Sequence, residues 1–239
     1  MTTENSESHV TDQRSHFHNE LDDLTHRILE TADRAERMVG MAVEAVARPD
    51  LALAQAVIDE DLIIDRDYLE THDRWVNLMA RQQPMGGDLR LMSVLLHLNT
   101  TLERMGDQCV NIAKMAQVTD GLPRADRIVE QIREMGDLVR PMIRVAMESF
   151  VRHDRDEARL LPAMDEPIDR INRNMYREVV SCGDEPQLLE WATRMMMVSR
   201  ALERVGDQAV DVGEQVVFLV TGDFQEFSDH GLADRGEQG

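Results

Sequence analysis

Apolar residues recur at steps of three and four along six long stretches of the chain, which is the pattern of helices with one buried face. The pattern predicts helices over residues 16–47, 51–81, 88–118, 124–151, 156–180 and from 186 to about 221. No stretch alternates apolar and polar residues between hairpin turns, so strands are not expected. The predicted fold class is all-α.

The third and sixth stretches carry the most regular apolar seams, typical of antiparallel helix packing. These seams are Leu91, Leu95, Leu98, Leu102, Met105, Cys109, Ile112 and Ala116, then Leu188, Met195, Val198, Leu202, Val205, Ala209, Val212, Val216 and Leu219. In the second stretch, the residues predicted to face inward are Ile58, Leu62, Leu69, Val76 and Met79.

Breaks between the stretches follow known helix signals. Asp88 is the expected N-cap of the third helix, and Pro186 suits the first turn of the sixth. Gly222 is expected to end that sixth helix. Pro141 falls inside the fourth helix, where a kink is predicted.

One segment occurs twice, 100 residues apart. Residues 102–111 read LERMGDQCVN and residues 202–211 read LERVGDQAVD, with seven of the first nine positions identical. The repeat predicts two consecutive three-helix bundles, over residues 16–120 and 121–222. Residues 1–15 are expected to be a disordered tail and residues 223–239 a polar C-terminal tail.

Acidic residues spaced four apart mark each half. Asp61 and Asp65 in the second helix match Asp165 and Asp169 in the fifth, and the repeated segment adds Glu103 with Asp107 and Glu203 with Asp207. Like charges at this spacing cost a helix about 0.2–0.5 kcal/mol per pair. A glycine within the helix costs about 0.8–1 kcal/mol relative to alanine.

Because both costs recur in both halves, we interpret the segments as a binding site, and the glycines as positions where another helix backbone or a ligand comes close. Oxygen ligands without histidine or cysteine favour hard cations. The alternative is a solvated face, on which the acids pair with Arg104 and Arg204.

Composition narrows the function classes. A net charge of −20 disfavours nucleic acid and anionic lipid as partners and favours cations or basic protein surfaces. The chain has no run of 18 uncharged apolar residues and no signal-like N-terminus, so a cytoplasmic protein is expected. It has no Glu-x-x-His pair, Gly-rich phosphate loop or Gly-x-Ser-x-Gly motif, and so lacks these catalytic signatures.

The two LER(M/V)GDQ segments, together with the turn QQPMGGDLR at residues 82–90, resemble the PhoU family of phosphate-transport and phosphate-signalling regulators. The resemblance covers roughly residues 18–222. It implies paired three-helix bundles with multinuclear metal clusters on their surfaces, holding iron, manganese, magnesium or zinc. The implied ligands are Asp61, Asp65, Glu103, Asp107 and Asn111, then Asp165, Asp169, Glu203, Asp207 and Asp211.

The resemblance also implies a non-enzymatic regulator, often a homodimer, without catalytic residues. Its implied partners are the ATPase subunit of a phosphate ABC transporter and a sensor histidine kinase. Pro167 lies between Asp165 and Asp169, so distortion is predicted there and the first-half site is the stronger expectation. Two alternatives remain, namely a Mg²⁺-dependent all-helical nucleotide pyrophosphatase and a metal-free helical scaffold.

Overall fold

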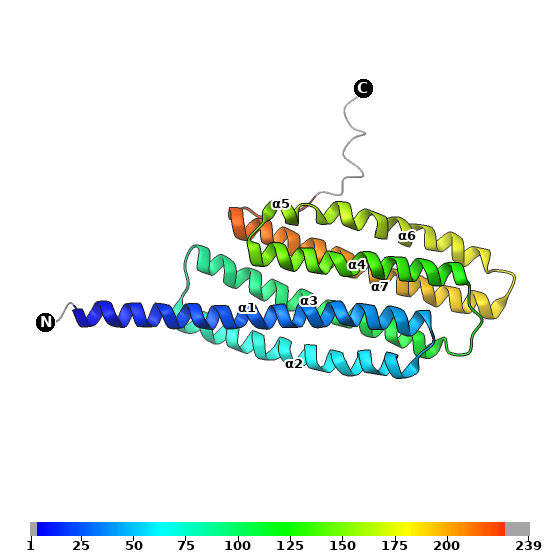
Figure 1. The fold of residues 1–239 in the computed structure, drawn as a ribbon, viewed down its shortest axis with the longest axis horizontal. Helices are drawn as coiled ribbons and strands as arrows, with labels where there is room; N and C mark the ends of the chain where they lie inside the picture. Colours follow the sequence, from blue (N-terminus) through cyan, green and yellow to red (C-terminus); the bar gives the residue numbers. More distant parts are fainter. Residues whose placement is uncertain (1–3, 228–239) are drawn as a thin grey trace, which may run out of the picture.

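The computed structural model describes residues 4–227, with side chains from residue 16 onward (Figure 1). The helices are α1 (Glu4–Ala47), α2 (Leu51–Gln82), α3 (Gly87–Val118), α4 (Asp126–Arg152), α5 (Arg155–Ala158), α6 (Leu161–Ser181) and α7 (Pro186–Thr221). No strand occurs within residues 4–227, which confirms the predicted all-α class.

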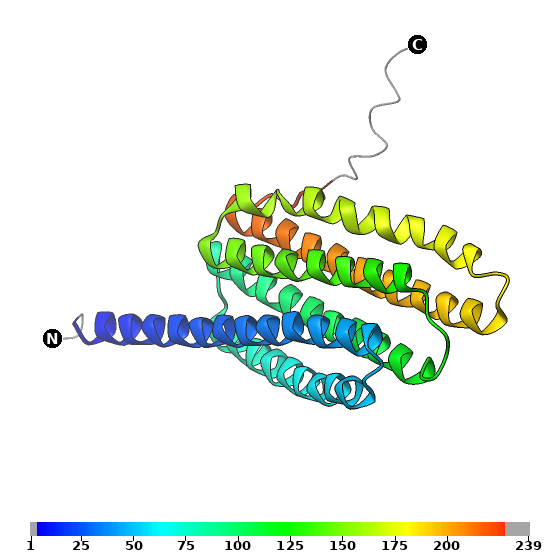
Figure 2. The same ribbon diagram turned by 45° about the vertical axis from the view of Figure 1, so that its right-hand side comes forward.

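Two sets of three long helices lie side by side in an elongated molecule (Figures 1 and 2). In the first set α1, α2 and α3 pack on one another, and in the second set α4, α6 and α7 do so. The sets meet where α1 lies along α4 and α3 lies along α7. One continuous apolar core therefore runs through both sets.

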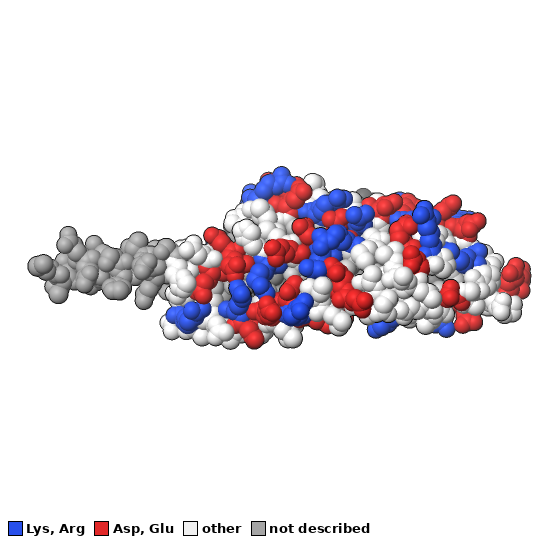
Figure 3. Space-filling view, turned by 60° about the horizontal axis from the view of Figure 1, so that its bottom comes forward, with Lys and Arg blue, Asp and Glu red and all other residues white. Residues whose placement is uncertain are grey.

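Polar contacts reinforce the junction between the sets. Arg140 of α4 pairs with Glu36 of α1 at 3.0 Å, and Arg133 pairs with Glu44 at 3.3 Å. Elsewhere, acidic and basic side chains are interspersed over the face seen in Figure 3, with uncoloured surface between them. Among the described residues, no helix has the length and apolar content needed to span a bilayer.

Most predicted helix limits agree with the structure. Pro186 is the first residue of α7, and Gly222 ends that helix in the left-handed conformation, with φ at 82°. α4 continues through Pro141. The seam residues predicted for α3 and α7 are buried, except for Leu91 and Leu188, which are partly buried against the core.

Three predicted limits were wrong. α1 begins at Glu4, within the predicted tail; helix propagation adds one hydrogen bond per residue and needs no apolar periodicity. Gly86, with φ at 60°, is the N-cap of α3, and Asp88 lies in its first turn. The expected helix over 156–180 is split into α5 and α6, since Pro162 lacks the N–H that a continuous helix requires.

The inward face of α2 also differs from the prediction. Leu62, Leu69 and Val76 are exposed on its outer side. The buried residues are Ala54, Val57, Asp61, Ile64, Thr71 and Leu78. This inward seam has the same three-and-four spacing, but two of its members are polar, so the more apolar outer stripe was mistaken for the core face.

Candidate metal centres

The second-half acids from two helices converge on one point. Carboxylate oxygens of Asp165 and Asp169 on α6 and of Asp207 on α7 lie within 4.8 Å of one another. No other group of three histidine, cysteine or acidic side chains within residues 16–227 meets that spacing. Three carboxylate oxygens so close together repel one another unless a proton or a cation lies between them.

Pro167 does not separate the carboxylates of Asp165 and Asp169, contrary to the predicted distortion. α6 continues through Pro167 from Leu161 to Ser181. At about 100° per residue, Asp165 and Asp169 each lie roughly 160° around the helix from Pro167. The missing hydrogen bond and the proline ring therefore face away from the carboxylates, and the pair keeps its one-turn spacing.

Asp165 is held close to the axis of α7. A Cβ on Gly206 would overlap the Oδ1 atom of Asp165, so only glycine leaves room for this carboxylate. The Oδ1 atom is buried and has no hydrogen-bond partner within the described residues. Burial, followed by the charges of Asp207 and Asp169, raises the pKa of Asp165 to about 7.

The first half repeats this arrangement with Asp61 and Gly106. A Cβ on Gly106 would lie 2.5 Å from the Oδ1 atom of Asp61, which is also buried without a partner. Burial, followed by the charges of Asp65 and Asp107, raises the pKa of Asp61 to about 6. A close approach does occur at the two glycines, but the approaching group is an aspartate side chain of the neighbouring helix, and not the helix backbone or ligand that was predicted.

The two glutamates of the repeated segment complete the acidic surroundings. Glu203 is buried; one of its oxygens pairs with Arg200 and the other, Oε2, is buried without a partner. Burial, followed by Asp207, raises the pKa of Glu203, and burial, followed by Asp107, raises that of Glu103. Glu203 is thus buried and Glu103 half-buried, whereas Asp107 and Asp207 are exposed, so the clusters lie at the edge of the core.

Asp211 and Asn111 face a different part of the molecule. The pKa of Asp211 is raised by burial and lowered by His97 and Arg104, both on α3. Asn111 lines a groove that also contains Arg204 of α7. Both residues therefore lie toward the junction between the sets, and Asp211 is not a member of the group of three carboxylates.

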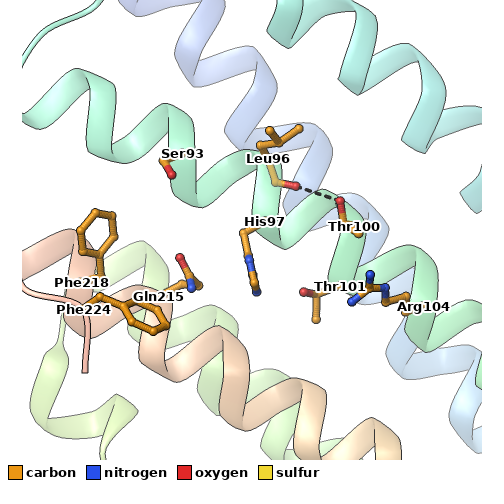
Figure 4. A pocket seen from close by; sticks show the side chains of 9 residues that line it. All are labelled: Ser93, Leu96, His97, Thr100, Thr101, Arg104, Gln215, Phe218 and Phe224. Atoms are coloured by element: carbon orange, nitrogen blue, oxygen red, sulfur yellow. Dashed lines mark hydrogen bonds between the residues drawn. The ribbon is translucent and has the colours of Figure 1, made fainter. Parts of the chain in front are cut away.

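Two grooves at this junction are related by the 100-residue repeat. The first, of about 630 Å³, is shown in Figure 4, where His97, Thr101 and Arg104 of α3 lie opposite Gln215 of α7. The second contains the matching positions Met197, Ala201 and Arg204 of α7 opposite Met115 of α3. The repeat thus shapes the junction as well as the acidic clusters.

The acidic clusters suit a cation. Each supplies carboxylate oxygens only, and each contains a buried oxygen without a hydrogen-bond partner. Leaving such an atom unsatisfied is costly, and a hard cation satisfies it without a donor hydrogen. Asp61, Asp65, Glu103 and Asp107 would hold metal in the first half, with Asp165, Asp169, Glu203 and Asp207 in the second.

Comparison with known proteins identifies the family. The family model described as the PhoU domain matches residues 19–116 and, separately, residues 132–216. The chain belongs to the PhoU family. Each match contains one complete acidic cluster, so the two halves are two copies of a single PhoU domain.

Relatives from several bacteria carry the same family name. The "phosphate-specific transport system accessory protein PhoU homolog" of Clostridium acetobutylicum is 29% identical over 90% of this chain and 99% of its own length. The homolog of the same name from Pseudomonas aeruginosa is 30% identical over 93% of this chain and 91% of its own. Nearly the whole helical part of the chain is thus shared with PhoU proteins.

Solved PhoU structures have the same fold. The crystal structure of PhoU from Pseudomonas aeruginosa matches with a TM-score of 0.81 and 31% identity, covering 87% of this chain and 100% of the other. The phosphate transport system regulatory protein PhoU from Streptococcus pneumoniae matches with a TM-score of 0.80 and 25% identity, over 87% and 99%. These PhoU structures confirm the predicted fold of paired three-helix bundles.

Arg200 and His97 were missed by the sequence reasoning. Arg200 pairs with the buried Glu203, and His97 faces Asp211 across the junction. Both lie before the repeated decapeptides, at positions 200 and 97. The 100-residue repeat flags neither, because Met197 stands at the position that matches His97 and Thr100 at the position that matches Arg200. The signal for Arg200 was its spacing of three residues from Glu203, since such positions share a helix face.

Proposed function

We propose that this protein is a non-enzymatic regulator of phosphate uptake and phosphate-starvation signalling that carries metal ions in its two acidic clusters. The convergence of Asp165, Asp169 and Asp207 is the observation that carries the metal-binding part. The regulatory part is supported by membership of the PhoU family, whose relatives are named as accessory proteins of phosphate-specific transport.

The ions act in this proposal as fixed positive charges. They satisfy the buried oxygens of Asp61 and Asp165 and neutralise the repulsion between neighbouring carboxylates. Iron, manganese, magnesium and zinc are the candidate ions, and the all-oxygen ligand set favours the harder ones. Asn111 and Asp211 remain predicted ligands, although they lie toward the junction between the sets.

The partners in this proposal are the ATPase subunit of a phosphate ABC transporter and a sensor histidine kinase, engaged in the cytoplasm by a homodimer. The relatives are named as accessory proteins of the phosphate-specific transport system, which supports the choice of the transporter as a partner. The net charge of −20 supports basic contact surfaces on both partners, because opposite charges speed encounter.

Elemental analysis with calorimetric titration tests metal binding. The protein is first freed of metal with a chelator and then titrated with Mn²⁺, Mg²⁺, Zn²⁺ and ferric citrate. The variants D61A/D65A and D165A/D169A are treated in the same way. Each variant should lose the ions of its own half and keep those of the other. Asp73→Ala, which removes an exposed acid of α2 outside the cluster, should bind like the wild type. Equal metal content in all four proteins would refute the ligand assignment.

A pull-down from phosphate-rich cells tests the regulatory role. The tagged protein should retain a transporter ATPase or a histidine kinase. A variant that combines D61A/D65A with D165A/D169A should retain less. Incubation with Mg²⁺ or Mn²⁺ and nucleotides is the companion assay. Turnover that is lost in the cluster variants would replace the regulator with the pyrophosphatase alternative.

A further inference from the structure

The outer side of α2 carries an apolar stripe that no other described residue covers. Leu62, Leu69 and Val76 expose 64%, 62% and 45% of their surfaces. They are seven residues apart, so they lie on one side of the helix, as in the seam of a coiled coil. α2 makes its main packing contacts with α1 and α3 through its other side.

The internal repeat shows that folding does not require these leucines. α6 is the counterpart of α2 at an offset of 104 residues, as the matching Asp61 and Asp165 show. The counterparts of Leu62 and Leu69 are Glu166 and Arg173, which pair at 3.2 Å on the surface of α6. The same position in the same fold is therefore satisfied by a solvated ion pair, and the leucines of α2 need another explanation.

Single exposed apolar residues are common, but an aligned set flanked by charge is typical of a docking surface. α2 contains seven carboxylates and three arginines. Two exposed acids, Asp65 and Asp73, lie about 40° to either side of the stripe on a helical projection. A second copy of this chain would bring the same acids against them, whereas a basic partner would not.

We propose that the outer side of α2 docks an amphipathic helix of another protein, whose apolar face is flanked by lysine or arginine. The leucines supply the apolar seam, and the acids beside it select the charge of the partner helix. Such a helix would lie lengthwise on the lower side of the molecule as drawn in Figure 1, where α2 forms the outer edge. Asp65 also belongs to the first-half acidic cluster, so its charge is fully available to the partner helix when that cluster holds no metal.

A fluorescent basic helix tests the proposal. The probe is a stapled peptide of about three heptads with leucine at its a and d positions and lysine or arginine at e and g. It is titrated in chelator, so a failure of the metal proposal leaves the result unaffected. The wild type should bind it, and L62E/L69R, which copies the ion pair of α6 without changing net charge, should bind at least tenfold more weakly.

Matched controls separate the stripe from general charge attraction. Y176E/V180R makes an equivalent charge-neutral change at exposed positions of α6 and should leave binding unchanged. A peptide of the same composition with its leucines scattered around the helix should bind poorly. A photo-crosslinker on the probe should label residues 58–76, a measurement that needs no variant.

Three results would overturn the proposal. Equal binding to the wild type and L62E/L69R would reduce the interaction to charge attraction. Crosslinks outside α2 would show that the peptide docks on another surface of the molecule. Self-association of the wild type in sedimentation, lost in L62E/L69R and unaccompanied by peptide binding, would assign the stripe to a second copy. Because the substituted positions are exposed, thermal unfolding should confirm that the variants stay folded.

Discussion

At the scale of single residues, each half of the molecule places a glycine of one helix against an aspartate of the helix before it in the chain. Gly106 leaves room for Asp61, and Gly206 leaves room for Asp165. The acids are thereby held in a partly dehydrated position, with one oxygen unpartnered. This local arrangement makes both carboxylates easier to protonate and predisposes them to bind a cation.

Alanine at position 106 should be unfavourable only while Asp61 is present. G106A gains about 0.8–1 kcal/mol of helix propensity. Its methyl group would lie 2.5 Å from the Asp61 carboxylate, an overlap expected to cost about 1–3 kcal/mol. Urea unfolding in chelator should therefore show G106A at or below wild-type stability and D61A/G106A above D61A. The same gain in both backgrounds would contradict the proposed contact.

Stability of the metal-free protein should depend on pH through the same two aspartates. Their pKa values, about 6 for Asp61 and about 7 for Asp165, exceed the ordinary 3.8. Between about pH 4 and 7 the folded state therefore binds more protons than the unfolded chain. This contribution to stability is fully present below about pH 4 and is lost as pH rises through the folded values.

The variant D61N/D165N isolates this effect. Between pH 5 and pH 7.5, the free energy of unfolding should fall more in the wild type than in the variant, by on the order of 1–3 kcal/mol. Urea titrations in chelator at the two pH values measure the difference. Parallel behaviour of the two proteins would mean that these carboxylates titrate normally. At pH 7.5, added metal should raise the free energy of unfolding of the wild type more than that of the variant.

At the scale of elements, α6 shows how a helix can contain proline and still present a pair of ligands. Pro162 lies in its first turn, where a missing N–H costs little, and Pro167 lies on the side opposite the acids. The effect of each proline depends on its distance from the first residue of the helix. In the predicted helix, which begins at Asp156, Pro162 and Pro167 are both interior residues. In the structure α6 begins at Leu161, so only Pro167 is interior.

P167A should stabilise the protein without changing its metal content. Alanine restores the hydrogen bond to the Ala163 carbonyl and removes the ring clash, so a gain on the order of 1–3 kcal/mol is expected. Thermal unfolding measures the gain, and elemental analysis of the loaded protein measures the ions. Loss of second-half metal in P167A would show that the proline sets the geometry of Asp165 and Asp169.

At the scale of the whole molecule, the two PhoU domains share one core and should unfold together. α4 approaches α1 closely at Gly136, where a Cβ would lie 2.8 Å from Val43 Cγ2. Ion pairs from Arg140 and Arg133 to α1 reinforce this contact. The contact leaves α2 and α6 as the outer helices of the two sets, so each has a side that no other described helix covers (Figure 2).

G136V should weaken this junction. The added side chain would overlap Val43, and a loss of about 1–3 kcal/mol is expected for overpacking. Calorimetry should show one transition in the wild type and a lower midpoint or two transitions in G136V. G87V is the matched control, because no atom lies within 4 Å of a Cβ at Gly87. Equal effects of both substitutions would indicate that the junction is not closely packed.

The sequence alone determined the helices with regular seams and the repeat, because spacing along one helix fixes which residues share a face. It indicated a close approach at Gly106 and Gly206 but not that an aspartate side chain makes it. It did not determine which face of α2 turns inward. Asp61 and Thr71 occupy buried positions while Leu62 and Leu69 remain exposed. The packing of α1 and α3 decided that orientation, since the space beside Gly106 admits the Asp61 carboxylate. The tertiary structure also decided that Asp211 faces α3. Asp211 lies eight residues after Glu203 and therefore about 80° around α7 from it, on the side where His97 and Arg104 of α3 pack.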